Sequence, residues 1–146
     1  MAESMESKNV IYGTWSEVWI DGYKIAEAME LKATMSADKE EVKIARHMGH
    51  AYKTTGYTAK GSIKVHKVSS YFIKKLAPSM KQGKQVLCEI VSNLADPDAW
   101  GNERIALHNV MFDSVDLINW SVGKVGEESY DFTFEDFDTI DEIDPK

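Results

Sequence analysis

Hydrophobic and polar residues alternate with a period of two along much of the chain. In "MELKATMSA", every second residue from Met29 to Ala37 is apolar, and the residues between them are polar. The same alternation returns in "YTAKGSIKVHKV" (57–68) and in "SYDFTFEDF" (129–137). Such a pattern is typical of a β-strand that has one face against a core. We therefore predict a protein built mainly from β-strands.

Turn signals separate the predicted strands. In "EVWIDGYKI" (17–25), Asp21-Gly22 lies between two short apolar runs, which is the strongest local signal for a type I′ β-hairpin. Beyond Ala37 the apolar residues shift from odd to even positions, so we expect a turn or bulge within "SADKEE" (36–41).

The segment that follows has no clear period. "ARHMGHAYKTTG" (45–56) is polar, contains two glycines and is predicted to be a loop. Few apolar contacts would hold such a segment in place. We therefore expect residues about 38–57 to form a mobile loop in the isolated protomer that becomes an interface loop on assembly.

One helix is predicted, over residues about 69–82. "SSYFIKKLA" places Phe72 and Leu76 on one helical face after two serines that can cap the helix. Pro78 is expected to end or kink this helix. Three apolar runs then predict further strands: "QVLCEIVSN" (85–93), "RIALHNVMF" (104–112) and "VDLINWSV" (115–122).

Together these segments predict about seven or eight strands with one short flanking helix. Period-two segments joined by frequent turns favour an antiparallel β-sandwich or β-barrel. At 146 residues the chain fits a single domain, 1–146. The acidic C-terminal tail, about 138–146, is expected to be mobile or docked on a neighbour.

Candidate chemistry is sparse. The lone cysteine, Cys88, excludes an internal disulfide and fits a reducing compartment. His47 and His50 could approach one metal ion, but no Cys, third His or nearby acid completes a zinc set. There is no Gly-x-Ser-x-Gly motif, no glycine-rich phosphate loop and no apolar run long enough for a transmembrane helix. We predict no enzyme activity, no catalytic, cofactor or metal site, and no membrane association.

Charge is distributed unevenly along the chain, which has a net charge of −7. Residues 1–94 carry 14 basic and 10 acidic side chains, whereas residues 95–146 carry 3 basic and 14 acidic ones. Between Val42 and Cys88 there are ten Lys or Arg residues and no Asp or Glu. Such asymmetry favours either an acidic tail or a protomer whose faces have opposite sign.

Three interpretations of the basic segment 42–88 remain open. It can be an ordinary solvated surface, because exposed lysines keep strands soluble. It can make the chain a nucleic-acid-binding β-barrel module, although only one arginine lies in it and the net charge opposes DNA. It can also meet the acidic C-terminal third of a neighbouring copy, because complementary charges favour association. The candidate interface residues are Arg46, Lys53, Lys60, Lys64, Lys74, Lys75, Glu128 and Glu135.

The segment "GYTAKGSIKVHKVSSYFIKKL" (56–76) resembles the corresponding stretch of phage tail tube proteins, and most closely that of the core tail proteins of PBSX-like prophages. The resemblance extends to the hairpin "GTWSEVWIDG", to "YKTTGY" before the strand, and to the acidic, aromatic "YDFTFEDFDTID" near the C-terminus. It therefore covers most of the chain.

The resemblance implies a β-barrel or β-sandwich with a flanking helix. It implies a virion structural protein that forms hexameric rings, which stack into a hollow tube through which DNA passes as cargo. The implied partners are further copies of the chain and the tail sheath, baseplate and tape-measure proteins. The implied locations are the bacterial host cytoplasm during assembly and then the virion tail. A minor tail protein, or a component of a type VI-like injection tube, is the alternative from the same fold.

Overall fold

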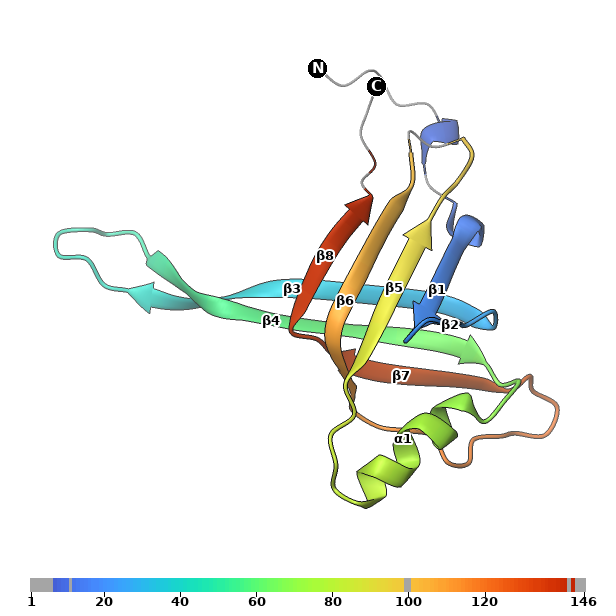
Figure 1. Ribbon diagram of the computed structural model, residues 1–146. Coiled ribbons are helices and arrows are strands. Elements are labelled where there is room, and N and C mark those ends of the chain that lie inside the picture. Colours follow the sequence, from blue (N-terminus) through green and yellow to red (C-terminus); the bar gives the residue numbers. More distant parts are fainter. Residues whose placement is uncertain (1–6, 11, 99–100, 142, 144–146) are drawn as a thin grey trace.

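A computed structural model describes residues 7–10, 12–98, 101–141 and 143 of the chain. Within these residues it contains eight β-strands and one α-helix, which confirms the mainly β fold predicted from the sequence (Figure 1). The elements are β1 (Ser16–Ile20), β2 (Tyr23–Lys24), β3 (Ala28–Val42), β4 (Ala51–His66), α1 (Tyr71–Lys81), β5 (Cys88–Leu94), β6 (Glu103–Phe112), β7 (Glu127–Thr133) and β8 (Asp136–Asp141).

The strands form two layers that cross each other in Figure 1. We call β2, β1, β5, β6 and β8 sheet A, and β3, β4, β7 and the C-terminal end of β6 sheet B. All the pairings are antiparallel. β6 belongs to both layers, because its first part pairs with β5 and β8 while Met111 and Phe112 pair with β7. The fold is thus a sandwich whose corner is made by a strand that changes sheet.

A bulge produces that corner. Cys88 lies opposite Val110 and Ile90 lies opposite Leu107, so β6 contains one residue more than β5 between these pairs. Asn109, in the bulge, has a φ of 54°, a left-handed conformation that Asn adopts more easily than most residues. An extra residue of this kind bends its strand and increases the local twist.

Side chains from both sheets and from α1 fill the core. Phe72 and Leu76 of α1 are buried, as the helical pattern predicted, and the Phe72 ring stacks on Tyr130 with centroids 4.4 Å apart. The rings of Phe112 and Phe132 extend this aromatic cluster toward the centre of sheet B. The largest fully buried side chains besides Tyr130, Phe132 and Leu76 are Ile20, Ile63, Val65, Ile90 and Val110.

Two turn predictions are confirmed. Asp21 and Gly22 both have positive φ, 51° and 81°, between the paired residues Ile20 and Tyr23, as a type I′ turn requires. The β3–β4 pairing also shifts register next to Asp38, which is the irregularity predicted within residues 36–41.

The predicted loop over residues 38–57 is corrected. β3 continues to Val42 and β4 begins at Ala51, so only residues 43–50 connect the two strands. The pattern missed these strand ends because nearly every side chain there is exposed on both faces. Without a core on one side, nothing imposes the alternation from which strands are predicted.

Four other predictions need adjustment. Residues 115–122 are not a strand but an irregular segment. The predicted strand 129–137 is divided between β7 and β8 at Phe134 and Glu135. The predicted tail over 138–146 is strand as far as Asp141, and residues 142 and 144–146 lie outside the described residues. Pro78 does not end α1, which continues to Lys81.

The β3–β4 hairpin extends well beyond the body of the molecule (Figure 1). We call its projecting part, residues 36–58, the arm. Between the pairs Ser36–Thr58 and Val42–Ala51 the arm runs for seven residues of β3, about 23 Å at the usual rise of a strand. Two strands without a covering layer are marginally stable in water. The arm is therefore the part of the fold that most needs another surface.

Candidate functional site

The described residues provide little for catalysis or metal binding. No group of three or more His, Cys, Asp or Glu residues among them could hold a metal ion. On the arm, His47 Nδ1 lies 2.9 Å from the Gly49 carbonyl oxygen, and His50 Nδ1 lies 2.7 Å from Glu41 Oε1. Burial raises the pKa of the Cys88 thiol to about 11, with Asp21 adding to the effect, so this thiol stays protonated. Within the same residues, no helix is long and apolar enough to cross a membrane.

The candidate basic residues do not converge on one surface. Arg46 lies in the turn of the arm, with a φ of 63°, and Lys53 lies on its β4 strand. Lys60 and Lys64 lie further along β4, on the face of sheet B opposite the buried Ala59 and Ile63. Lys74 and Lys75 belong to α1. The continuous basic stretch of the sequence is therefore distributed over three parts of the molecule.

Two ion pairs join the basic segment to the acidic C-terminal third within one protomer. Lys64 Nζ lies 3.3 Å from Glu127 Oε2, and both side chains are more than 40% exposed. Lys67 Nζ lies 3.0 Å from Glu128 Oε1, where the carboxylate is only 4% exposed and also accepts a hydrogen bond from the Tyr130 hydroxyl. β4 and β7 are neighbours, so their opposite charges meet across the strands. Glu128 thus has partners within its own chain.

Glu135 and Lys75 also have structural contacts. Glu135 lies at the β7–β8 corner, where its Oε2 accepts a 3.0 Å hydrogen bond from Asn109 Nδ2. Lys75 Nζ donates to Asp21 Oδ2, which attaches α1 to the β1–β2 turn. Burial raises the pKa of Asp21, but the hydrogen bonds from Lys75 and from the Glu89 backbone N–H outweigh burial, so the pKa is lowered overall. Burial lowers the pKa of Lys75, but the bond to Asp21 outweighs it and the pKa is raised.

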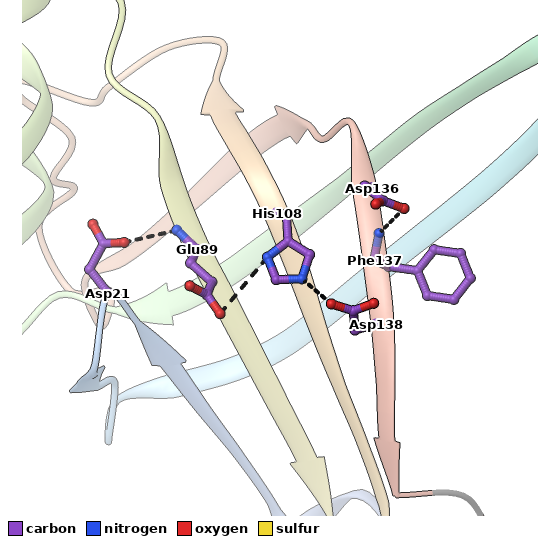
Figure 2. A network of polar contacts seen from close by, with 6 residues as sticks. All are labelled: Asp21, Glu89, His108, Asp136, Phe137 and Asp138. Atoms are coloured by element: carbon purple, nitrogen blue, oxygen red, sulfur yellow. Dashed lines mark hydrogen bonds and ion pairs between the residues drawn. The ribbon is translucent and has the colours of Figure 1, made fainter.

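The outer face of sheet A carries a set of acidic side chains that come from distant parts of the sequence. Ile90 and Leu107 are buried, and side chains alternate between the two faces of a strand. Their sequence neighbours Glu89 and His108 therefore point away from the core. His108 lies between two carboxylates (Figure 2): its Nε2 is 2.7 Å from Asp138 Oδ2 and its Nδ1 is 3.9 Å from Glu89 Oε1. We call this surface the acidic face; its carboxylates are Glu17, Glu89, Asp136, Asp138 and Asp141.

Few cations balance the acidic face. Lys24 Nζ lies 3.5 Å from Glu17 Oε2, and the Arg104 guanidinium lies 5.7 Å from the centre of the Trp19 ring. The charge totals had indicated an acidic C-terminal third, from which Asp136, Asp138 and Asp141 come. Glu17 of β1 and Glu89 of β5 join this face because β1 pairs with β5 and β5 pairs with β6. Composition alone does not reveal these pairings.

Exposed apolar side chains are concentrated in two places. On the arm, Ile44, Met48 and Tyr52 are 53%, 101% and 62% exposed. In the irregular segment before β7, the most exposed large apolar side chains are Ile118, Trp120, Val122 and Val125, at 75–91%. Clusters of exposed apolar side chains on a protein surface mark contact surfaces. The sequence pattern had predicted a strand over residues 115–122, which include Ile118, Trp120 and Val122.

An apolar groove lies between α1 and the residues that follow β6. It measures about 880 Å³, and its apolar lining comes from Ile73, Ala77, Pro78, Met80, Val115 and Leu117. Lys74, Lys81 and Asp113 lie at its margin. The sequence analysis did not identify this groove, although the spacing of Ile73, Ala77 and Met80 is that of one helical face.

Comparison with known proteins identifies the family. The family described as "Phage tail tube protein" matches residues 3–141. The chain is 30% identical over 142 residues to "Phage-like element PBSX protein XkdM" of Bacillus subtilis (strain 168), covering 96% of this chain and 97% of that protein.

Solved structures share the fold. A chain of the anti-feeding prophage tube-terminating cap has a TM-score of 0.72 at 8% identity, over 94% of this chain and 95% of that one. A chain of the sheath-tube complex of an extracellular contractile injection system has a TM-score of 0.67 at 9% identity, over 93% and 98%. The chain belongs to the phage tail tube family, whose role is structural and not enzymatic.

Proposed function

We propose that this tail tube protein assembles with copies of itself into hexameric rings, and that the rings stack into a hollow tube through which DNA leaves the virion. The observation that carries the proposal is the arm. It projects from the body, exposes Ile44, Met48 and Tyr52, and has no covering layer among the residues that the structure describes. Burying these side chains on a neighbouring copy would stabilise both the arm and the contact.

The acidic face supports the second part of the proposal. A channel that conducts DNA should not bind it, and carboxylates repel the phosphate backbone. Sheet A brings five carboxylates to one surface, with Lys24 and Arg104 as the cations beside them. We propose that the β1 and β5 part of the acidic face, with Glu17 and Glu89, lines the bore, and that the carboxylates of the edge strand β8 lie where this face meets the next subunit. We propose that the basic residues of the arm, β4 and α1 also lie at contacts between subunits.

The interface role of the eight predicted residues is part of the proposal. Arg46, Lys53, Lys60 and Lys74 are exposed and are available to a neighbouring copy. The other four predicted residues already have partners in their own chain: Lys64, Lys75, Glu128 and Glu135. At an interface, each would contact the neighbouring copy in addition to keeping its partner within the chain.

A nucleic-acid-binding module is less well supported. Such a module needs its cations on one continuous surface that can follow the phosphates. Here Lys60 and Lys64 lie on β4 whereas Lys74 lies on α1, and Lys64 is engaged by Glu127. We expect the purified protein not to retard DNA at moderate salt; strong, salt-sensitive retardation would favour the nucleic-acid module instead.

Tail partners follow from the same proposal. Chains of similar fold occur in the sheath-tube complex of an extracellular contractile injection system and in the baseplate of the anti-feeding prophage. We propose that this chain likewise contacts sheath, baseplate and tape-measure proteins, after assembly in the bacterial cytoplasm.

Electron microscopy of the purified full-length chain over a series of rising concentrations tests the proposal. Tubes with sixfold end views are expected. Single rings that never lengthen would point to a minor tail protein of the same fold. A protein that remains monomeric at every concentration would contradict the proposed self-assembly.

A further inference from the structure

Helix α1 has a second apolar face that the core does not use. Phe72 and Leu76 face the core, whereas Ile73, Ala77 and Met80 follow one another at helical spacing on another side and line the groove. An amphipathic surface helix normally has a single apolar stripe. The second stripe, together with Val115 and Leu117, therefore forms a surface suited to a further layer of protein.

The margin of the groove indicates the charge of its occupant. Lys74 and Lys81 are seven residues apart, on the same side of the apolar stripe, and both border the groove together with the single carboxylate of Asp113. In the part of the chain that the structure describes, neither lysine takes part in an ion pair. A segment that contains both apolar residues and carboxylates could pack against the apolar lining and pair with the two lysines.

We propose that the groove receives β8 of a second copy of this chain, an inference that rests on the proposed self-assembly. β8 is an edge strand that pairs with β6 on one side. All its residues are exposed, including Phe137 at 40% and Ile140 at 55%. Asp136, Asp138 and Asp141 alternate with these apolar side chains.

The other exposed apolar segments fit the groove less well. The arm carries charges of both signs, with no net negative charge to complement Lys74 and Lys81; its charged residues are Asp38, Lys39, Glu40, Glu41, Lys43, Arg46 and Lys53. The segment containing Trp120 continues directly from the wall of the groove at Leu117. β8 is thus the exposed apolar segment whose charges complement the margin.

The contact must form between copies. β8 and α1 lie at different ends of the same protomer (Figure 1), so a protomer cannot fill its own groove. Because the groove and β8 are different surfaces, the contact is heterologous, and repeating it produces a closed ring or an open helix. This is the kind of contact that a tube subunit needs.

Charge exchange tests the pairing. The groove variant combines Lys74→Glu with Lys81→Glu, and the strand variant combines Asp136→Lys with Asp141→Lys. Each should raise the concentration needed for assembly by about tenfold or more, because like charges then face each other across the contact. The matched control, Lys74→Arg with Lys81→Arg, keeps the charge and should assemble as the original chain does.

Mixing provides the decisive result. In a mixture of the two variants, every groove can meet a strand of opposite charge, so alternating copies should assemble again in sedimentation and electron microscopy. A chain with Ala77→Cys and Ile140→Cys should also form cross-linked ladders with a short bifunctional maleimide, since Cys88 is buried.

The outcomes separate the inference from the proposed function. If the unmodified chain assembles and the groove variant assembles equally well, or if mixing restores nothing, the groove does not receive β8 although the tube function stands. If the unmodified chain never assembles, the proposed function fails and the inference fails with it. Thermal melting of each variant establishes that loss of assembly is not loss of folding.

Discussion

Removing the arm should separate folding from assembly. The test variant deletes residues 39–55 and joins Asp38 to Gly56 through an Asn-Gly turn. It spares Asp38, whose carboxylate accepts a hydrogen bond from Thr58 Oγ1, and Tyr57, whose hydroxyl donates to the Glu135 carbonyl oxygen. The Asp38–Gly56 pair that closes the new turn is already present in the β3–β4 ladder.

The structure gives the expected magnitudes. All but one of the deleted residues are exposed, and the first buried residue of β4 is Ala59, beyond the deletion. The free energy of unfolding of the monomer should therefore change by less than about 0.5–1 kcal/mol, which is a few degrees at most for a domain of this size. On a neighbouring copy, burying Ile44, Met48 and Tyr52 would contribute about 4 kcal/mol, or roughly a thousandfold in the association constant.

Two measurements check these values. Thermal unfolding reports on the monomer, and electron microscopy with sedimentation reports on assembly. Lys39→Gln with Glu40→Gln, two exposed polar positions of the arm, serves as the matched control and should assemble normally. Tubes of ordinary length from the deletion variant would show that the arm has no role in assembly. A melting temperature lowered by ten degrees or more would show that the arm supports the fold, contrary to its exposure.

Three further variants test the fold and the charge argument. Gly61→Ala should destabilise by about 1–3 kcal/mol in thermal melting, because a Cβ there would lie 2.5 Å from a buried phenylalanine ring and from a backbone oxygen. The pKa of Asp21 is lowered in the folded state, so its contact with Lys75 stabilises the fold above pH 3.8 and loses this effect as the pH falls through the lowered pKa. Acid unfolding of Asp21→Asn should accordingly be less steep below pH 3.8 than that of the original chain; an unchanged profile would contradict this assignment. Lys60→Glu with Lys64→Glu should change monomer stability by only about 0–1 kcal/mol, as exposed ion pairs do, yet prevent assembly; normal tubes would leave both lysines as ordinary solvated side chains.

Local chemistry explains which parts of the fold could be predicted. The Asp21-Gly22 turn and the burial of Phe72 and Leu76 depend on conformational preference and helical spacing, both of which are present in a short stretch of sequence. The arm was mistaken for a loop because its strands have no buried face. The segment around Trp120 was mistaken for a strand because its apolar residues resemble those of a core, although they are exposed.

The candidate surfaces depend on contacts between distant residues. The acidic face requires β5 and β8 to lie on either side of β6, and Glu89 is separated from Asp138 by 49 positions in the sequence. The groove requires α1 to lie beside Val115 and Leu117, which follow a strand whose bend at Asn109 has no strong sequence signal. The second apolar stripe of α1 was visible in the sequence, but its position relative to the core was not.

The pairing within the protomer changes how the charge asymmetry of the chain should be interpreted. Part of the basic segment is neutralised locally, since Lys64 meets Glu127 and Lys67 meets Glu128 across β4 and β7. Exposed cations remain on the arm, on β4 at Lys60 and on α1, whereas the exposed carboxylates of sheet A lie on the acidic face, which includes those of β8. These surfaces belong to different elements at different ends of the molecule. Opposite charges that cannot meet within one copy can meet between copies, and this residual charge, rather than the total along the chain, is the electrostatic term available for assembly.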